Sequence, residues 1–177
     1  MLFRSRFSAQ ISLLCLLGAL LAGPQTAFAK PGIGTATGLP LPRFASTKFN
    51  EVNVRAGPSR DHDVVWKFMK SGIPVEITQE FDIWLRIRDS EGDEGWVQKS
   101  LLSGKRGGFI TPWEKKGTVP LRDKPDPAGR IVANLDPKVL VEILECTGQW
   151  CRVSAAGNKG WVDQSRLWGA YPGESFR

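Results

Sequence analysis

Trp84-Leu85-Arg86-Ile87, followed by Gly95-Trp96-Val97, returns later in the chain as Trp150-Cys151-Arg152-Val153, followed by Gly160-Trp161-Val162. Shorter matching pieces precede each copy, namely Val52-Asn53-Val54-Arg55 with Val75-Glu76-Ile77 and Val119-Pro120-Leu121-Arg122 with Val141-Glu142-Ile143. Arg122 lies 67 residues after Arg55, whereas Trp161 lies 65 residues after Trp96. Because turns tolerate single-residue deletions, this drift indicates one unit of about 60 residues duplicated in tandem.

Each copy has the pattern of short β-strands. β-branched and aromatic residues dominate short runs, turn residues such as Ala56-Gly57-Pro58-Ser59 separate the runs, and no window keeps a helical period. We therefore predict an all-β protein of two tandem, small, SH3-like five-stranded barrels. The expected strands cover 49–55, 64–68, 73–78, 84–88 and 95–98 in the first copy and 117–122, 130–135, 139–145, 150–154 and 159–162 in the second.

The first 29 residues have the features of a secretory signal peptide. Arg4 and Arg6 precede an apolar run over 11–22, and Ala27-Phe28-Ala29 forms a small-x-small cleavage site. A retained membrane anchor is the alternative, which the short and glycine-broken run disfavours. We expect cleavage after Ala29, and hence a periplasmic or extracellular protein without a stable transmembrane anchor.

Composition predicts the boundaries of the remaining chain. Residues 30–43 are rich in Gly, Pro and Thr and are expected to form a flexible arm, and 105–112 contain Gly107-Gly108 and are expected to be the linker. The two barrels would then occupy 44–104 and 113–169, with a polar tail over 170–177.

The net charge bounds the class of partner. The chain carries 24 Lys and Arg against 18 Asp and Glu, a formal charge of +6, which falls to +4 if Arg4 and Arg6 leave with the signal. This mild excess suits anionic envelope polymers or lipid surfaces and is too weak to indicate a nucleic-acid partner. Lys99, Lys105, Arg106, Lys115 and Lys116 lie around the expected linker, where they either bind an anionic polymer or keep the linker soluble.

Cys146 and Cys151 are the two cysteines that remain after the expected cleavage. They flank Thr147-Gly148-Gln149-Trp150, a short loop between apolar runs, so a disulfide across a hairpin is geometrically reachable. Export would supply an oxidising compartment, and a reduced buried pair is the alternative. Since the closed loop is short, we expect a stabilisation of only about 2 kcal/mol.

The motifs of both copies resemble the bacterial SH3 domain. Asn53-Val54-Arg55-Ala56-Gly57-Pro58-Ser59 is similar to the opening signature of that family, and Glu145–Val153 resembles its central hairpin in the cysteine-bearing form. The resemblance covers 44–104 and 113–169, although Asp123-Lys124 replace Ala56-Gly57 in the second copy.

This resemblance implies an exported or envelope-associated protein whose SH3 units bind peptidoglycan, its peptides or protein partners. It implies no activity, so a periplasmic protein adaptor and an auxiliary subunit of a separate wall hydrolase stay open as alternatives. The proline-peptide groove of eukaryotic SH3 domains is not carried over. Gln98 and Asp163 stand where its proline would be, and Tyr171 lies outside both copies.

The sequence lacks the parts of a catalytic site. His62 is the single histidine, both remaining thiols are expected to be bonded, and no serine lies in a nucleophile elbow. The side chains of Asp61, His62 and Asp63 alternate in direction on an extended loop and cannot converge on one metal ion. We therefore expect no enzyme activity, no cofactor and no metal site.

Tryptophans are the most informative candidates for ligand contact. Trp96 and Trp161 adjoin Val97 and Val162, so if the valines fill the cores these tryptophans point outward, and the same reasoning applies to Trp84 and Trp150. Outward indoles can stack on sugar rings or peptide backbone, or they can be buried against loops or the other barrel. Trp66 has Ala133 as its counterpart and would serve one unit only. The candidate ligand-binding residues are thus Trp66, Trp84 and Trp150, whereas the duplicated Arg55 and Arg122 are expected to be structural.

Overall fold

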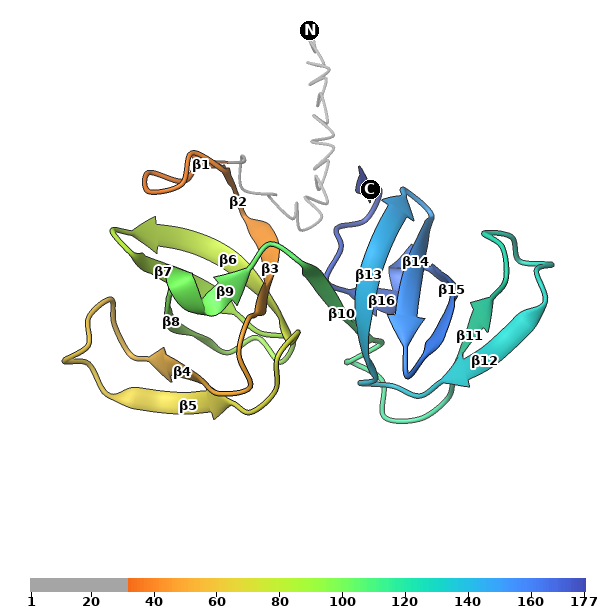
Figure 1. Cartoon of the computed structure of the whole chain (residues 1–177), viewed down its shortest axis with the longest axis horizontal. Coiled ribbons are helices and arrows are strands. Elements are labelled where there is room, and N and C mark those ends of the chain that lie inside the picture. Colours follow the sequence, from red (N-terminus) through yellow and green to blue (C-terminus); the bar gives the residue numbers. More distant parts are fainter. Residues whose placement is uncertain (1–31) are drawn as a thin grey trace, which may run out of the picture. The chain divides into compact units, whose positions relative to one another are not determined.

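The computed structural model describes residues 32–177. It contains two antiparallel β-barrels, drawn from orange to green and from green to blue in Figure 1. The expected signal peptide lies outside the described residues. Within the described part of the chain, no helix is long and apolar enough to cross a membrane.

The first barrel is built on a seven-stranded sheet in the order β5-β4-β8-β7-β6-β3-β9. Leu85 and Ile87 point into its core and Leu85 lies opposite Val97, as the alternation of the sequence predicts. The elements are β3 (Arg43–Thr47), β4 (Val52–Arg55), β5 (Val64–Phe68), β6 (Pro74–Phe81), β7 (Trp84–Arg88), β8 (Glu94–Gln98), η1 (Lys99–Leu101) and β9 (Leu102–Ser103).

The second barrel has the strand order β12-β11-β15-β14-β13-β10-β16, with β17 paired to β13. Its core contains Leu121, Val153 and Val162, all fully buried. The elements are β10 (Arg106–Ile110), β11 (Val119–Arg122), β12 (Ile131–Leu135), β13 (Leu140–Thr147), β14 (Trp150–Ala155), β15 (Asn158–Asp163), η2 (Gln164–Arg166), β16 (Leu167–Trp168) and β17 (Ser175–Phe176).

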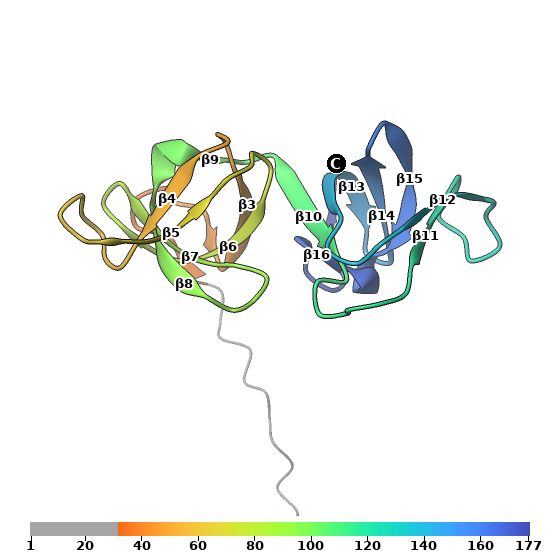
Figure 2. The ribbon, with the colours of Figure 1, turned by 90° about the horizontal axis from the view of Figure 1, so that it is seen from below.

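The duplication extends to the irregularities of the sheets. Arg55 pairs with Trp96 and Arg122 with Trp161, and each of these arginines follows a register shift at the end of its strand. The equivalent strand pairs, β4 with β5 and β11 with β12, can be followed in Figure 2. The predicted all-β architecture of two tandem barrels is confirmed. Each barrel has a further strand ahead of the predicted five, β3 or β10, and a short strand after them, β9 or β16, and the second barrel also has β17.

The segment predicted as a linker is strand β10 of the second barrel, so that prediction was wrong. β10 pairs with both β13 and β16. Its glycines allow close packing, because a Cβ at Gly107 would overlap the Gly72 carbonyl oxygen and one at Gly108 would press on Leu167 and Ile143. Glycine here permits a close approach of two backbones, which composition alone cannot distinguish from a flexible joint.

The segment predicted as a flexible arm is also folded in its described part. β1 (Gly32–Ile33) and β2 (Pro40–Leu41) form a hairpin, which we call the N-terminal hairpin (residues 32–41). Glu80 of β6 holds it, because its carboxylate accepts hydrogen bonds from the amides of Ala36 (2.9 Å) and Thr37 (3.0 Å) and from the Thr37 hydroxyl (2.6 Å). Arg43 completes the cluster at 2.8 Å.

The electrostatics of Glu80 follow from this cluster. The side chain is only 1% exposed. Burial raises its pKa, but the hydrogen bonds from Thr37, Arg43 and Ala36 outweigh burial, and the net pKa is lowered. The carboxylate is therefore ionised in the folded protein and fastens a segment whose sequence alone has no periodic signal.

The predicted polar tail packs as part of the fold. Tyr171 donates a hydrogen bond from its hydroxyl to Glu76 Oε1 of β6 (2.8 Å), and its ring lies 4.8 Å from that of Phe44. Trp168 contacts Phe44 edge-on, with ring centroids 5.0 Å apart. Burial and the Glu76 carboxylate raise the pKa of Tyr171, so its phenol stays protonated and acts as the donor. The C-terminal segment thus joins the two barrels.

Candidate functional site

The disulfide of the second barrel is present as predicted. Cys146 of β13 and Cys151 of β14 are bonded, directly opposite each other in the antiparallel pair, with Cα atoms 4.1 Å apart. Both residues are buried. The bond therefore holds the hairpin next to Trp150, the first residue of β14.

Trp84 forms one wall of a hollow of about 300 Å³ in the first barrel, which we call the first hollow. Trp84 is 7% exposed, so only a small part of its side chain reaches the surface. The remaining lining residues come from β4, the loop after it, the end of β8 and η1, namely Asn53, Arg55, Arg60, Gln98 and Leu101.

Arg55 holds the loop that forms the rim of the first hollow. Its guanidinium donates to the carbonyl oxygens of Arg60 (3.0 Å) and His62 (2.7 Å), which braces the loop after β4. Arg122 makes the equivalent bond to the Gly129 carbonyl oxygen (2.6 Å). Both arginines bond to backbone carbonyl oxygens of their own barrel, which fits the structural role expected for them. Arg60 has no ion-pair partner among the described residues and leaves a positive charge at the rim.

Trp150 lines the corresponding hollow of the second barrel, the second hollow, of about 400 Å³. Here the indole is half-buried, and Gln149, Asp163, Gln164 and Ser165 supply the polar side chains of the lining. Gln164 is 4% exposed and donates from Nε2 to the carbonyl oxygens of Tyr171 (2.7 Å) and Glu174 (3.0 Å). Its Oε1 is buried and has no donor within the described part of the chain. Asp163, which is exposed, places a carboxylate in the lining of the second hollow.

The third predicted residue, Trp66, lies in neither hollow. It stands on β5, half-buried, and packs edge-on against Phe68 with centroids 6.3 Å apart. Its indole N–H is buried without an acceptor among the described residues. The structure thus places Trp84 and Trp150 at equivalent points of two barrels and leaves Trp66 apart, so the three tryptophans do not share one lining.

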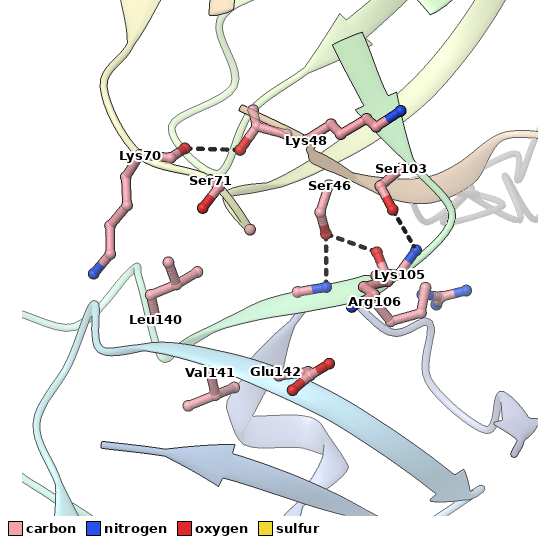
Figure 3. A pocket seen from close by; sticks show the side chains of 13 residues that line it. Ser46, Lys48, Lys70, Ser71, Ser103, Lys105, Arg106, Leu140, Val141 and Glu142 are labelled. Carbon is pink, nitrogen blue, oxygen red and sulfur yellow. Dashed lines mark hydrogen bonds between the residues drawn. The ribbon is translucent and has the colours of Figure 1, made fainter. Parts of the chain in front are cut away.

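Sequence reasoning missed a groove of about 580 Å³ where the two barrels meet, which we call the seam groove (Figure 3). Of the basic residues predicted around the linker, Lys105 and Arg106 line it, whereas Lys115 and Lys116 line a different depression. Lys48 and Lys70 of the first barrel complete its positive lining. Their distance from Lys105 in the sequence hides this grouping.

Within residues 32–177, no group of three or more His, Cys, Asp or Glu side chains is placed to hold a metal ion. His62 packs its imidazole against Gly57, where an added Cβ would overlap the ring. The arrangement suits noncovalent binding, with an indole wall in each barrel and polar groups beside it.

The comparisons with known proteins agree with this architecture. The family model of the bacterial SH3 domain matches residues 48–104 and 115–169, more than half of the chain. A curated relative, the putative N-acetylmuramoyl-L-alanine amidase YrvJ of Bacillus subtilis (strain 168), is 22% identical over 120 residues. That match covers 64% of this chain and 23% of the relative.

Two solved structures, NlpC1 and NlpC2 from Trichomonas vaginalis, also overlap with the chain, each at a TM-score of 0.33 and 14% identity. The overlaps cover 76% and 72% of this chain and 48% of each of those chains. The chain therefore spans less than half the length of the relatives that it matches.

Proposed function

The chain belongs to the bacterial SH3 domain family through both of its barrels, and on this premise we propose that it is a non-catalytic, exported protein that binds the cell wall. Peptidoglycan is the preferred ligand, and another envelope component is the alternative. One observation supports the proposal most directly, the recurrence of a tryptophan-walled hollow at the same point of both barrels.

The chemistry of the two hollows suits different parts of one polymer. The face of an indole can contact a sugar ring or a peptide backbone, because both present C–H groups to its π-system. Arg60 at the first hollow complements a carboxylate, whereas the exposed Asp163 at the second can accept an N–H such as that of an amide. Peptidoglycan presents sugars, amides and carboxylates together.

The matched relative supports this choice of ligand. Its printed name refers to N-acetylmuramoyl-L-alanine, which is the junction of sugar and peptide in the wall. We do not extend its amidase activity to this chain, which spans 23% of that protein. Export, through the expected signal peptide over residues 1–29, is part of the proposal, and two tethered modest sites would raise avidity if both engage.

Cosedimentation with purified peptidoglycan tests the proposal. We expect binding that survives moderate salt, and we expect Trp150→Ala to weaken it about fivefold through loss of the indole contact. Trp113→Ala is the matched control, because Trp113 is 57% exposed and lines neither hollow. Absence of cosedimentation at both low and moderate salt rejects the proposal, as does an equal loss in the two variants.

Arg60→Ala tests the first hollow separately, with Arg130→Ala, another exposed arginine, as its control.

Cross-linking in the envelope that traps one protein, without binding to the wall, would instead support the adaptor. Turnover of wall fragments by the purified chain would contradict the non-catalytic assignment.

A further inference from the structure

The seam groove exists because the two barrels pack together. The first barrel contributes the end of β3 and the turn between β5 and β6, and the second contributes β10 and the start of β13. Figure 3 shows Ser46, Lys70 and Ser71 on one side and Leu140 and Glu142 on the other. Neither barrel alone forms this lining.

The groove is held in shape by hydrogen bonds between its own walls. Ser46 Oγ accepts from the Gly107 amide (2.7 Å) and donates to the Lys105 carbonyl oxygen (2.9 Å), which joins β3 to β10. Thr47 Oγ1 donates to the Lys70 carbonyl oxygen (2.8 Å) and accepts from the Ile73 amide (3.0 Å). Because these bonds brace the first-barrel wall and join it to β10, little backbone entropy would be lost there when a ligand binds.

Three lysines of the groove have no ion-pair partner among the described residues, namely Lys48, Lys70 and Lys105. Other charges at the meeting of the barrels are paired. Lys138 of the second barrel bonds to Glu91 of the first at 2.9 Å, and Arg106 is neutralised by Glu174 at 2.7 Å. The groove therefore keeps an excess of positive charge where the rest of the contact does not, which favours an anionic ligand.

Two further side chains narrow the chemistry of that ligand. Glu142 places one carboxylate in the groove, which would repel a polyphosphate chain but accept an ammonium group. Leu140 lies 4.0 Å from the point where a Cβ at Gly72 would stand, so an apolar surface adjoins the lysines. We propose that the seam groove binds a short acidic peptide that carries more carboxylates than amines, with the lysines on its carboxylates and Glu142 on its amine. This site is separate from the two hollows.

The test uses the purified protein and an acetylated tetrapeptide of alanine, glutamate, lysine and alanine, which carries two carboxylates and one amine. We expect the double substitution Lys48→Gln with Lys70→Gln to weaken binding about tenfold in isothermal titration calorimetry. Lys124→Gln with Lys159→Gln is the matched control, since these exposed lysines lie outside the groove and remove the same charge. Equal loss in the two double variants overturns the site.

Glu142→Gln separates the peptide from other anions. We expect it to weaken binding of the tetrapeptide and to strengthen binding of inorganic phosphate and of a glycerol phosphate polymer. If those phosphates bind the unaltered protein more tightly than the tetrapeptide and displace it, the peptide assignment is wrong. The proposals for the groove and for the hollows can be tested separately. Trp150→Ala should leave tetrapeptide affinity unchanged, whereas the lysine double substitution should weaken it about tenfold.

Discussion

The β6–β7 hairpin of the first barrel and the β13–β14 hairpin of the second occupy the same place in a duplicated fold, yet they are secured differently. Glu80 pairs with Leu85 in the first, at the position where Cys146 pairs with Cys151 in the second. Glu80 fastens the N-terminal hairpin by ionic hydrogen bonds, whereas the cysteines close their own hairpin covalently. The two copies have thus kept the same strand register, while the interaction that stabilises this position differs between them.

The two equivalent tryptophans, Trp84 and Trp150, also have different surroundings. Trp84 is buried beside arginines, while Trp150 is half-buried beside Asp163 and Gln164. A barrel core is set by alternating apolar residues, so residues on the outer face can change without cost to the fold. The comparison teaches that equivalent position does not imply equivalent ligand chemistry.

Glu80→Gln should have the largest effect. It removes the charge that partners Arg43, and in either orientation its N–H₂ faces donors, namely the amides of Ala36 and Thr37 or the Arg43 guanidinium. We expect a loss of about 3 kcal/mol in the free energy of unfolding of the N-terminal hairpin, measured by hydrogen exchange of residues 32–41. Glu94→Gln is the control, because its ion pair with Arg86 is solvent-exposed. Unchanged exchange in Glu80→Gln would contradict the ionic anchor.

Removal of the disulfide, by Cys146→Ala with Cys151→Ala, should have the next effect. We expect a loss of about 2 kcal/mol in the free energy of unfolding, measured by denaturant titration, because the closed loop is short. A reductant should shift the unaltered protein by the same amount and leave the double variant unaffected. A shift of the double variant with reductant would show that the bond is not the cause.

The acid dependence of stability should give the smallest effect. The folded pKa of Glu80 is lowered, so its contribution is fully present above the unfolded pKa and is lost as the pH falls through the folded pKa. Protonation keeps the side chain in place, so part of the hydrogen bonding persists. The measurement is thermal unfolding of both proteins at neutral and at acidic pH. Between these two pH values the unaltered protein should lose more stability than Glu80→Gln. Equal losses would assign the acid dependence to other carboxylates.

Much of the barrel architecture could be predicted from the sequence alone. Leu85, Ile87 and Val97 alternate with polar or aromatic neighbours, and Cys146 and Cys151 flank a short turn. These signals are local, because a strand's side chains change face at every residue and a hairpin joins residues close in sequence. The repeat strengthened them, since each element is seen twice.

Only the tertiary structure showed which segments far apart in the sequence are joined by polar contacts. Glu80 meets Thr37 across 43 residues and Tyr171 meets Glu76 across 95, and no periodic pattern indicates such partners. The segment around Gly107 has the composition of a linker. Only the nearby Gly72 carbonyl oxygen shows that Gly107 lets strand β10 pack against another backbone. The seam groove arises in the same way, because its lysines come from segments that only folding brings together.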